Sequence, residues 1–283
     1  MAKNSPIEWT HHTFNPWWGC RKVSPACDNC YAELWAKRMG HRLWEPDAPR
    51  RFFGDFHWRE PLKWNEEARR SGQRHRVFCA SMADVFESRA DLNRERVRLW
   101  ELISNTPYLD WLLLTKRPHN IERIAPWKAN WPANVWIGTS VENQQMAEKR
   151  LPHLVRIPAL VRFLSCEPLL GSLDLRDWFR RDDCYAIDWV IAGGESGARS
   201  RPMHPDWVLS LLHQCRQFDV PFHFKQWGQW VPLQLLDGRY SAELFELNNE
   251  RPIEMVRLNK KLTGRTLEGT TWDGIPLTSL TNV

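Results

Sequence analysis

The chain has 283 residues, a net charge of +5, 42% hydrophobic residues and 26% charged residues. These values are ordinary for a globular protein with one large α/β domain or two small ones, and no apolar run approaches the ~20 residues that cross a bilayer, which argues against a membrane protein. The unusual feature is the 18 tryptophans. Most are expected in the core, but together with the positive charge they leave nucleic acid or nucleotide binding open.

The first motif is a loop with three cysteines. Residues 7–20 read as extended, and Cys20, Cys27 and Cys30 follow, with six residues between the first pair and two between the second. A helical pattern over 31–39 comes directly after them. A structural zinc site usually has four protein ligands, whereas an iron–sulfur cubane held by three thiolates keeps one iron open to an outside ligand. Three thiolates therefore favour a cubane.

Other interpretations of the loop stay open. A zinc knuckle completed by His11, His12 or His57 is one, and ordinary thiols are another. A structural disulfide fits worst, because the chain has an odd number of cysteines and no signal peptide precedes them. We therefore expect a reducing, cytoplasmic environment.

The rest of the chain alternates between strands and helices. Apolar runs that end in polar residues are predicted to be strands, at 76–84, 111–118, 134–142, 160–168, 189–197 and 221–228. Helices are expected at 92–104, 144–151 and 205–217, while a region without clear period near 41–64 is predicted to be an insertion, with a helical turn over 65–70.

Continuous apolar strands that alternate with helices predict a parallel sheet buried on both faces. Because polar residues gather at the C-terminal ends of the strands, we expect a complete or partial parallel β/α barrel over 1–228, with its site at the C-terminal mouth. An open doubly wound sheet is the alternative. Residues 229–283 are predicted to be an irregular or β-rich C-terminal appendage packed on the barrel.

The strand ends supply candidate cofactor ligands. Gly193 and Gly194 would let backbone amides approach a ligand, and Glu195 would receive an ammonium group or a ribose hydroxyl. Ser140 and Glu142 offer a similar hydroxyl and carboxylate, suited to an adenosylated amino acid.

The same strand ends supply candidate catalytic residues. Lys116 and its neighbour Arg117 are expected to meet a carboxylate, namely Glu167, Glu195 or that of a ligand. Lys225 would hold the second substrate. Cys166 is either a hydrogen-atom donor or a packed core thiol.

Several segments together resemble a known family. They are 14–20 (FNPWWGC), Cys27 with Cys30, 114–118 (LTKRP), 136–142 (WIGTSVE), 165–169 (SCEPL) and 193–197 (GGESG). This combination is similar to a phage- and bacteria-encoded family of three-cysteine proteins that is regarded as radical-SAM-like, where SAM is S-adenosylmethionine. The resemblance covers nearly the whole chain.

The resemblance implies a β/α barrel of radical SAM type and a [4Fe–4S] cluster on Cys20, Cys27 and Cys30, with SAM on the open iron. The commonest radical SAM motif has three residues between its first two cysteines and an aromatic residue before the third. This chain has six residues and Asn29 at those places, and Tyr31 would take the place of the aromatic residue.

These observations predict a radical SAM enzyme that receives its electron from an external donor. The substrate is expected to be a nucleic acid base (DNA or RNA) or a nucleotide, with phosphates at Lys260, Lys261 and Arg265 unless these cations are simply solvated. Two rival hypotheses are a zinc-stabilised nucleic-acid-binding protein without catalysis and a nuclease. The nuclease would gather Asp84, Glu142 and Glu167 around Mg²⁺.

Overall fold

The fold is built around one large, mostly parallel sheet in a computed structural model that describes residues 2–45, 47–179, 186–246 and 250–277. Its eight strands are, in spatial order, β1 (Ala2–Lys3), β2 (His12–Thr13), β5 (His75–Cys79), β6 (Leu109–Thr115), β7 (Val135–Ser140), β8 (Arg162–Cys166), β9 (Trp189–Gly193) and β10 (Phe222–Gln226). All neighbours pair in parallel except β1 and β2. Because the spatial order follows the chain order and β1 does not pair with β10, the sheet forms a partial β/α barrel. The six strands predicted after the cysteine loop are confirmed.

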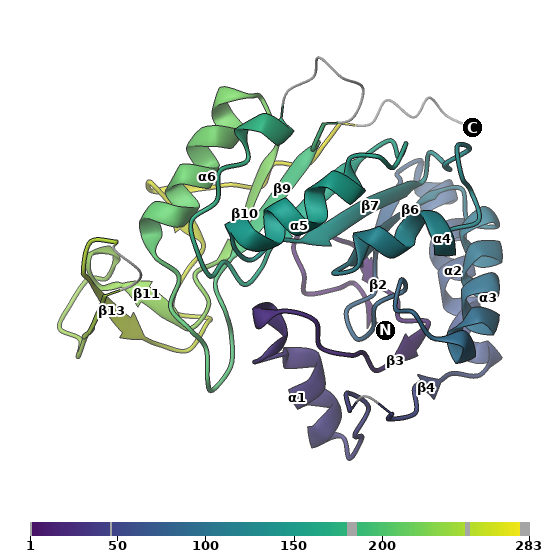
Figure 1. Ribbon diagram of the computed structural model, residues 1–283, viewed down its shortest axis with the longest axis horizontal. Coiled ribbons are helices and arrows are strands. Elements are labelled where there is room, and N and C mark those ends of the chain that lie inside the picture. The colour runs from purple at the N-terminus through teal and green to yellow at the C-terminus, as the bar shows by residue number, and fades with distance from the viewer. Residues whose placement is uncertain (1, 46, 180–185, 247–249, 278–283) are drawn as a thin grey trace.

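Helices cover one face of this sheet. They are α2 (Asp55–Ser71), α3 (Asn93–Ser104), α4 (Ile121–Ile124), α5 (Gln144–Leu154) and α6 (Pro205–Gln217). In Figure 1, α5 and α6 lie in front of the sheet, α2 and α3 lie beside it, and α1 (Tyr31–Arg38) is set apart below it, near the short strands β3 (Trp17–Trp18) and β4 (Arg51–Phe52). None of the helices in the described ranges is long and apolar enough to cross a membrane.

The ends of two helices have local causes. The side chain of Asn143 accepts a hydrogen bond from the Met146 amide at the start of α5, and the His204 side chain accepts one from the Asp206 amide at the start of α6. Pro205 occupies the first turn of α6, where its missing amide hydrogen costs nothing. The predicted bounds of α6 are therefore met.

Helix α2 corrects the prediction of an irregular insertion near 41–64. It runs through Pro61, and its buried face consists of Trp58, Pro61, Trp64 and Ala68. Proline and tryptophan have low helix propensity, so the helical spacing of these buried residues was not recognised in the sequence. Packing of this face against the sheet outweighs the low propensity.

The opposite face of the sheet has an aromatic floor. Trp9, Phe78, Trp136, Phe163 and Trp189 are all buried and form one cluster with Leu112 and Ile191. Its rings are close, with centroids of Trp9 and Phe78 at 4.7 Å and of Trp136 and Trp189 at 6.1 Å. Phe163 lies against Gly138, where an added Cβ would meet its ring at 2.5 Å. Many of the tryptophans are therefore core residues, as expected.

The C-terminal region covers the open edge of the sheet. Strands β11 (Trp230–Pro232), β13 (Ile253–Arg257) and β12 (Glu243–Phe245) form a small antiparallel sheet, and β14 (Thr266–Leu267) pairs with β15 (Thr270–Thr271). The chain then runs along β10, where the amide of Phe224 donates to Trp272 O at 2.9 Å and that of Gly274 donates to Phe222 O at 2.9 Å. Covering this edge protects the sheet from pairing with another chain.

His223 on β10 is expected to make the stability of the fold depend on pH. It is 1% exposed, neither ring nitrogen has a hydrogen-bond partner within the described residues, and burial together with the nearby Arg265 lowers its pKa to about 4. The unfolded chain, with a histidine pKa of about 6.5, takes up the proton first on acidification, so stability falls between about pH 6.5 and 4.

We expect this histidine to remove about 1–2 kcal/mol of stability between pH 7.5 and pH 5. Urea unfolding at the two pH values measures the loss, which should shrink by that amount in His223→Leu. The matched control is His213→Leu, since His213 is exposed on α6. An undiminished loss in His223→Leu would contradict the assignment.

Candidate functional site

The polar residues at the strand ends meet at the C-terminal mouth of the partial barrel. Lys116 Nζ donates to Ser140 Oγ at 3.0 Å, which joins the ends of β6 and β7. Lys225 Nζ forms an ion pair with Glu167 Oε2 at 2.6 Å, which joins β10 to the end of β8. Burial lowers the pKa of Lys225, but Glu167 outweighs it and raises the pKa above its usual value. Lys116, Ser140 and Lys225 were predicted site residues, and the structure brings them to this mouth.

One carboxylate oxygen of Glu167 accepts no hydrogen bond within the described residues. Its Oε1 atom is buried and has no hydrogen-bond partner among the described residues, while Oε2 is held by Lys225. A buried carboxylate oxygen without a donor costs free energy. This oxygen is therefore suited to accept a hydrogen bond from a ligand.

The cysteine loop lies beside the mouth. Cys20 and Cys30 are partly buried against a cluster that includes Trp18 and Ala32, and Cys30 is the residue before the first turn of α1. The three thiols are free, and burial raises the pKa of Cys20 to about 12 and raises that of Cys30. Tyr31, the first residue of α1, donates its hydroxyl to Ser81 O at 3.0 Å and keeps 57% of its surface exposed.

One carboxylate holds the loop from β7. Glu142 is fully buried, forms an ion pair with Arg150 of α5 at 2.7 Å and accepts a 3.4 Å hydrogen bond from the amide of Ala26, between Cys20 and Cys27. Burial raises the pKa of Glu142, but Arg150, Ser24 and Lys116 together more than offset this and hold the pKa below its usual value. Glu142 was predicted to bind a cofactor directly; its carboxylate is paired with Arg150 in the structure, and the contact with a cofactor stays a prediction.

A second carboxylate holds the loop from β9. Glu195 accepts hydrogen bonds from Arg201 Nη2 at 2.6 Å and from the side chain of Asn29 at 3.0 Å. Arg201 Nη2 also donates to Pro25 O at 3.0 Å. Glu195, like Glu142, therefore positions the cysteine loop, and its role as an ammonium or ribose ligand stays a prediction.

The glycines beside Glu195 are also explained by packing. An added Cβ on Gly194 would lie 1.9 Å from Trp227 O, and the Gly194 amide already donates to Gln226 O at 2.9 Å. At Gly193 the nearest atom would be Gln226 O, at 3.3 Å. The close approach that requires glycine is thus an approach to β10, and the Gly194 amide is not available to a ligand.

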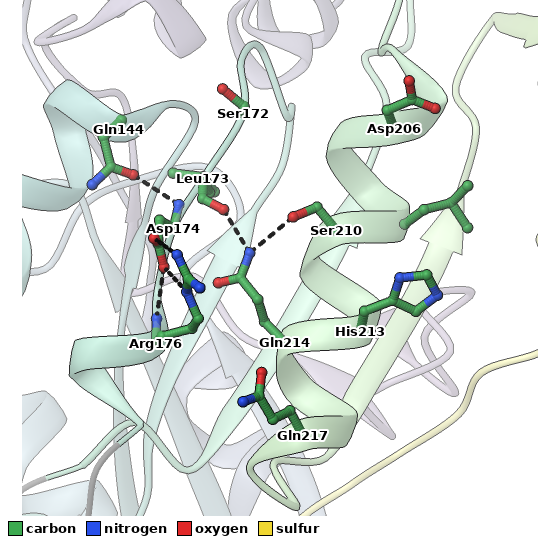
Figure 2. A pocket seen from close by; sticks show the side chains of 11 residues that line it. Gln144, Ser172, Leu173, Asp174, Arg176, Asp206, Ser210, His213, Gln214 and Gln217 are labelled. Carbon is green, nitrogen blue, oxygen red and sulfur yellow. Dashed lines mark hydrogen bonds and ion pairs between the residues drawn. The ribbon is translucent and has the colours of Figure 1, made fainter.

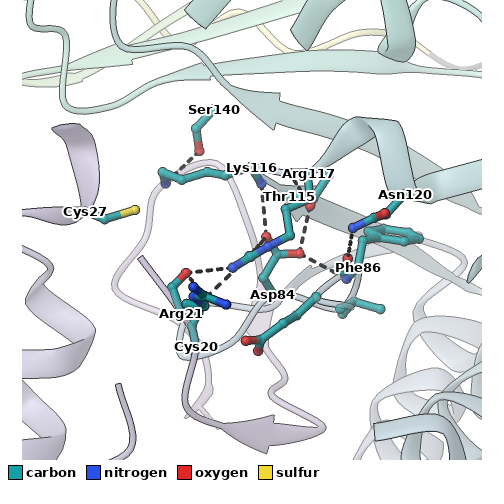
Figure 3. A network of polar contacts seen from close by, with 12 residues as sticks. Cys20, Arg21, Cys27, Asp84, Phe86, Thr115, Lys116, Arg117, Asn120 and Ser140 are labelled. Atoms are coloured by element: carbon teal, nitrogen blue, oxygen red, sulfur yellow. Dashed lines mark hydrogen bonds and ion pairs between the residues drawn. The ribbon is translucent and has the colours of Figure 1, made fainter. Parts of the chain in front are cut away.

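Arg117 links Cys20 to the end of β6, as Figure 3 shows. Its Nη1 atom lies 2.7 Å from Asp84 Oδ2 and 3.6 Å from Cys20 Sγ, and its Nη2 atom donates to Arg21 O at 2.6 Å. Its carboxylate is therefore Asp84, and the predicted partners Glu167 and Glu195 are wrong for this residue. Burial lowers the pKa of Arg117, but Asp84 and Cys20 raise it further, so the guanidinium stays charged.

Cys166 lies apart from the mouth. It is fully buried, in the same cluster as Leu164 and Cys215 on the helix-covered side of the sheet. Burial raises its pKa well above the usual value. Successive residues of a strand point to opposite faces, so Ser165 and Glu167 face the mouth side while Cys166 faces the core. The role of hydrogen-atom donor is therefore not supported, and Cys166 is a core thiol.

Neither rival metal site is assembled. His11 Nδ1 accepts a hydrogen bond from the amide of Arg76, His12 contacts His75, and His57 bonds to Asn15 O, so each has partners away from the cysteines. The carboxylates of a magnesium site are instead paired with cations, Asp84 with Arg117, Glu142 with Arg150 and Glu167 with Lys225. Over the described ranges, no group of three or more His, Cys, Asp or Glu side chains is close enough to hold a metal ion, and this holds for the three cysteines of the loop as well.

A separate cavity of about 770 Å³ lies between the start of α5, the 172–176 loop and α6 (Figure 2). Its polar groups are used within the fold. Gln214 Nε2 donates to Leu173 O at 2.8 Å, and Gln144 Oε1 accepts from the Asp174 amide at 2.9 Å. These bonds hold the loop to the two helices. The polar side chains that form them therefore have a structural role that requires no ligand.

Three residues of the site were not predicted to act there, namely Asn29, Arg150 and Arg201. Each acts on a residue distant in the chain or across a turn, and no motif marks such partners. The signal is position: Arg150 lies on α5 eight residues after Glu142, and Arg201 follows Glu195 in the same loop. The proposed phosphate contact Arg265 is paired with Asp273, whereas Lys260 and Lys261 are exposed.

Comparisons with known proteins show the family. Residues 4–276 match the family described as "protein of unknown function (DUF5131)", and the chain belongs to it. No curated protein matches the chain significantly.

The chain is also similar in structure to solved forms of spore photoproduct lyase. A cysteine-to-serine variant gives a TM-score of 0.49 at 13% identity over 92% of this chain and 72% of that one. A form with bound AdoMet and dinucleoside spore photoproduct gives 0.46 at 10% identity over 89% and 70%, respectively. Similarity of this degree does not carry a conclusion about function.

Proposed function

We propose that this protein is a radical SAM enzyme that holds a [4Fe–4S] cluster through Cys20, Cys27 and Cys30. The observation that carries the proposal is the placement of the cysteine loop. Two carboxylate–arginine pairs, one from the end of β7 and one from the end of β9, fix the loop beside the mouth of a parallel partial barrel. A loop used only for stability would not need two buried carboxylates at the place where β/α barrels carry their sites.

The donor set fits this cluster better than a single ion. Three thiols share one loop, and the histidines that would complete a zinc site, His11, His12 and His57, have hydrogen-bond partners elsewhere. A cubane binds its cysteines at different iron atoms, so its ligands stand farther apart than those of one zinc ion. Three thiolates also leave one iron for an outside ligand.

SAM would lie in the mouth, against residues whose hydrogen-bonding or charged groups are not fully paired within the protein. Glu167 Oε1 is the buried acceptor without a donor, and Lys116 forms no ion pair within the described ranges. We assign Glu167 to an amino or hydroxyl group of SAM and Lys116 to its carboxylate, with Ser140 and Tyr31 beside them. When bound, the cluster and SAM supply a 5′-deoxyadenosyl radical that abstracts hydrogen from a substrate, using an electron from an external donor.

The chain contributes positioning and the exclusion of water. The aromatic floor of Phe163, Trp136 and Trp189 closes the barrel below the mouth. The ion pair of Lys225 with Glu167 fixes the orientation of the carboxylate, so that Oε1 is presented without reorganisation. The substrate class that we propose is a nucleic acid base or nucleotide.

Glu167→Gln tests the assignment of the mouth. Loss of a charge-assisted hydrogen bond of ~1.5–3 kcal/mol should weaken SAM binding roughly 10- to 150-fold in anaerobic calorimetry. Lys225→Gln is the matched control, because it breaks the same ion pair but keeps the carboxylate, and its SAM affinity should fall less. Equal affinities of Glu167→Gln and the unchanged protein would place SAM elsewhere.

A further inference from the structure

A second cavity, of about 700 Å³, lies next to Cys20 and differs in chemistry from the mouth. It is formed by the 21–23 stretch of the cysteine loop, the 87–89 loop after β5, the 116–120 segment after β6 and the 149–150 stretch of α5. Seven of its lining residues are Lys or Arg and two are Asp or Glu. A concave surface with one sign of charge concentrates counter-ions.

Much of this charge is neutralised inside the protein. Arg117 is paired with Asp84, Arg150 with Glu142, Arg89 with Asp91, and Lys22 with Glu33. The carboxylate of Glu87 is in turn held by buried Arg50, at 2.8 Å. The cations in these pairs are therefore not counted as free charge for a ligand.

Three cations of the cavity remain without a carboxylate. The side chains of Arg21 and Lys149 are exposed and form no hydrogen bond or ion pair within the described part of the chain. Lys116 contacts only the hydroxyl of Ser140. Against these three stands one exposed carboxylate, that of Asp47. The cavity therefore has a net positive charge that is free to act on an anion.

We propose that this cavity binds a phosphate group of the substrate, either of a nucleotide or of a nucleic acid backbone. This inference rests on the proposed function, because it names the substrate class of that site. Lysine and arginine hold phosphate through charge-assisted hydrogen bonds, and a hollow suits a phosphate group better than the flat face of a protein. The inference moves the phosphate contact away from Lys260, Lys261 and Arg265.

Lys116 connects the cavity to the mouth. It lines the cavity and also contacts Ser140, which is one of the residues assigned to the mouth. A phosphate held by Lys149 and Arg21 is thus adjacent to Lys116, which is assigned to the carboxylate of SAM, and to the place where the radical would be formed. The attached sugar and base then extend from the cavity toward the mouth.

The test uses the full chain in two double variants that remove equal charge. Arg21→Ala with Lys149→Ala changes the cavity, and Lys260→Ala with Lys261→Ala changes the exposed turn near the C-terminus. Fluorescence anisotropy with a labelled mononucleotide and a labelled single-stranded 12-mer, over a salt series, distinguishes the two sources of phosphate.

For the cavity variant we expect roughly 5- to 30-fold weaker binding of at least one probe. If the 12-mer is the better ligand, the log–log salt slope should also fall by about 1.4, or 0.7 for each of two contacts. The control variant should match the unchanged protein.

Equal affinity of the cavity variant and the unchanged protein for both probes overturns the inference, as does an equal effect of the control. Slower reduction of the iron by an acidic electron-donor protein, with phosphate binding unchanged, would assign the cavity to that protein instead. Because the binding assay does not depend on SAM cleavage, its failure is distinct from failure of the proposed function.

Discussion

Each of the variants Cys20→Ala, Cys27→Ala and Cys30→Ala should lose the iron and the brown colour of the anaerobically purified protein. The unchanged protein should contain about four irons and four sulfides per chain, as the cubane requires. With two thiolates left, the cluster would lack a ligand on a second iron, and we expect it to be lost. Iron and sulfide analysis with the visible spectrum measures the effect.

Cys79→Ala and Cys166→Ala are the controls, because both thiols are fully buried in the core on strands of the sheet. They should keep their iron while losing some stability. Full iron content in all three loop variants would contradict the cluster assignment, and one zinc without sulfide in the unchanged protein would favour the rival zinc protein.

Arg150→Met should have the largest effect on stability. Arg150 and Glu142 form an ion pair whose side chains are 4% and 0% exposed, so the variant leaves a buried carboxylate without its cation. Breaking such a pair costs about 3–5 kcal/mol. We expect this decrease in the free energy of unfolding by urea, together with lower iron loading, because Glu142 also holds the amide of Ala26 in the cysteine loop.

The double variant Arg150→Met with Glu142→Gln separates charge from packing. It removes the unpaired charge, so it should recover part of the stability lost in the single variant. Arg69→Met is the surface control, since Arg69 pairs with Glu66 in solvent, and it should leave stability unchanged. A single variant as stable as this control would show that the pair does not hold the loop.

The strands and the polar residues at their C-terminal ends were predictable because their signals are local. Apolar runs such as 111–114 end in polar residues and a proline, and these features mark both the strand and its C-terminal end. The start of α6 was predictable for the same reason, from Pro205 after a capping residue. Helix α2 was missed because its buried face is made of tryptophan and proline.

The roles of individual carboxylates were not predictable in the same way. Glu142, Glu167 and Glu195 all follow strands, and the sequence does not state which of them meets an arginine. In the structure Glu142 pairs with Arg150 and Glu195 pairs with Arg201. One carboxylate oxygen of Glu167 has no hydrogen-bond donor among the described residues. Such differences arise from contacts between distant segments, as does the orientation of Cys166 toward the core.

Cleavage of SAM by the reconstituted protein tests the central claim most directly. The iron-loaded protein would be incubated anaerobically with SAM and dithionite, and the products separated by liquid chromatography with mass detection. Radical SAM chemistry predicts 5′-deoxyadenosine and methionine in equal amounts, with neither formed by the Cys20→Ala, Cys27→Ala or Cys30→Ala variants. The central claim would be contradicted by protein that has a full complement of iron and sulfide, a reduced cluster and bound SAM, yet forms no 5′-deoxyadenosine with or without oligonucleotide.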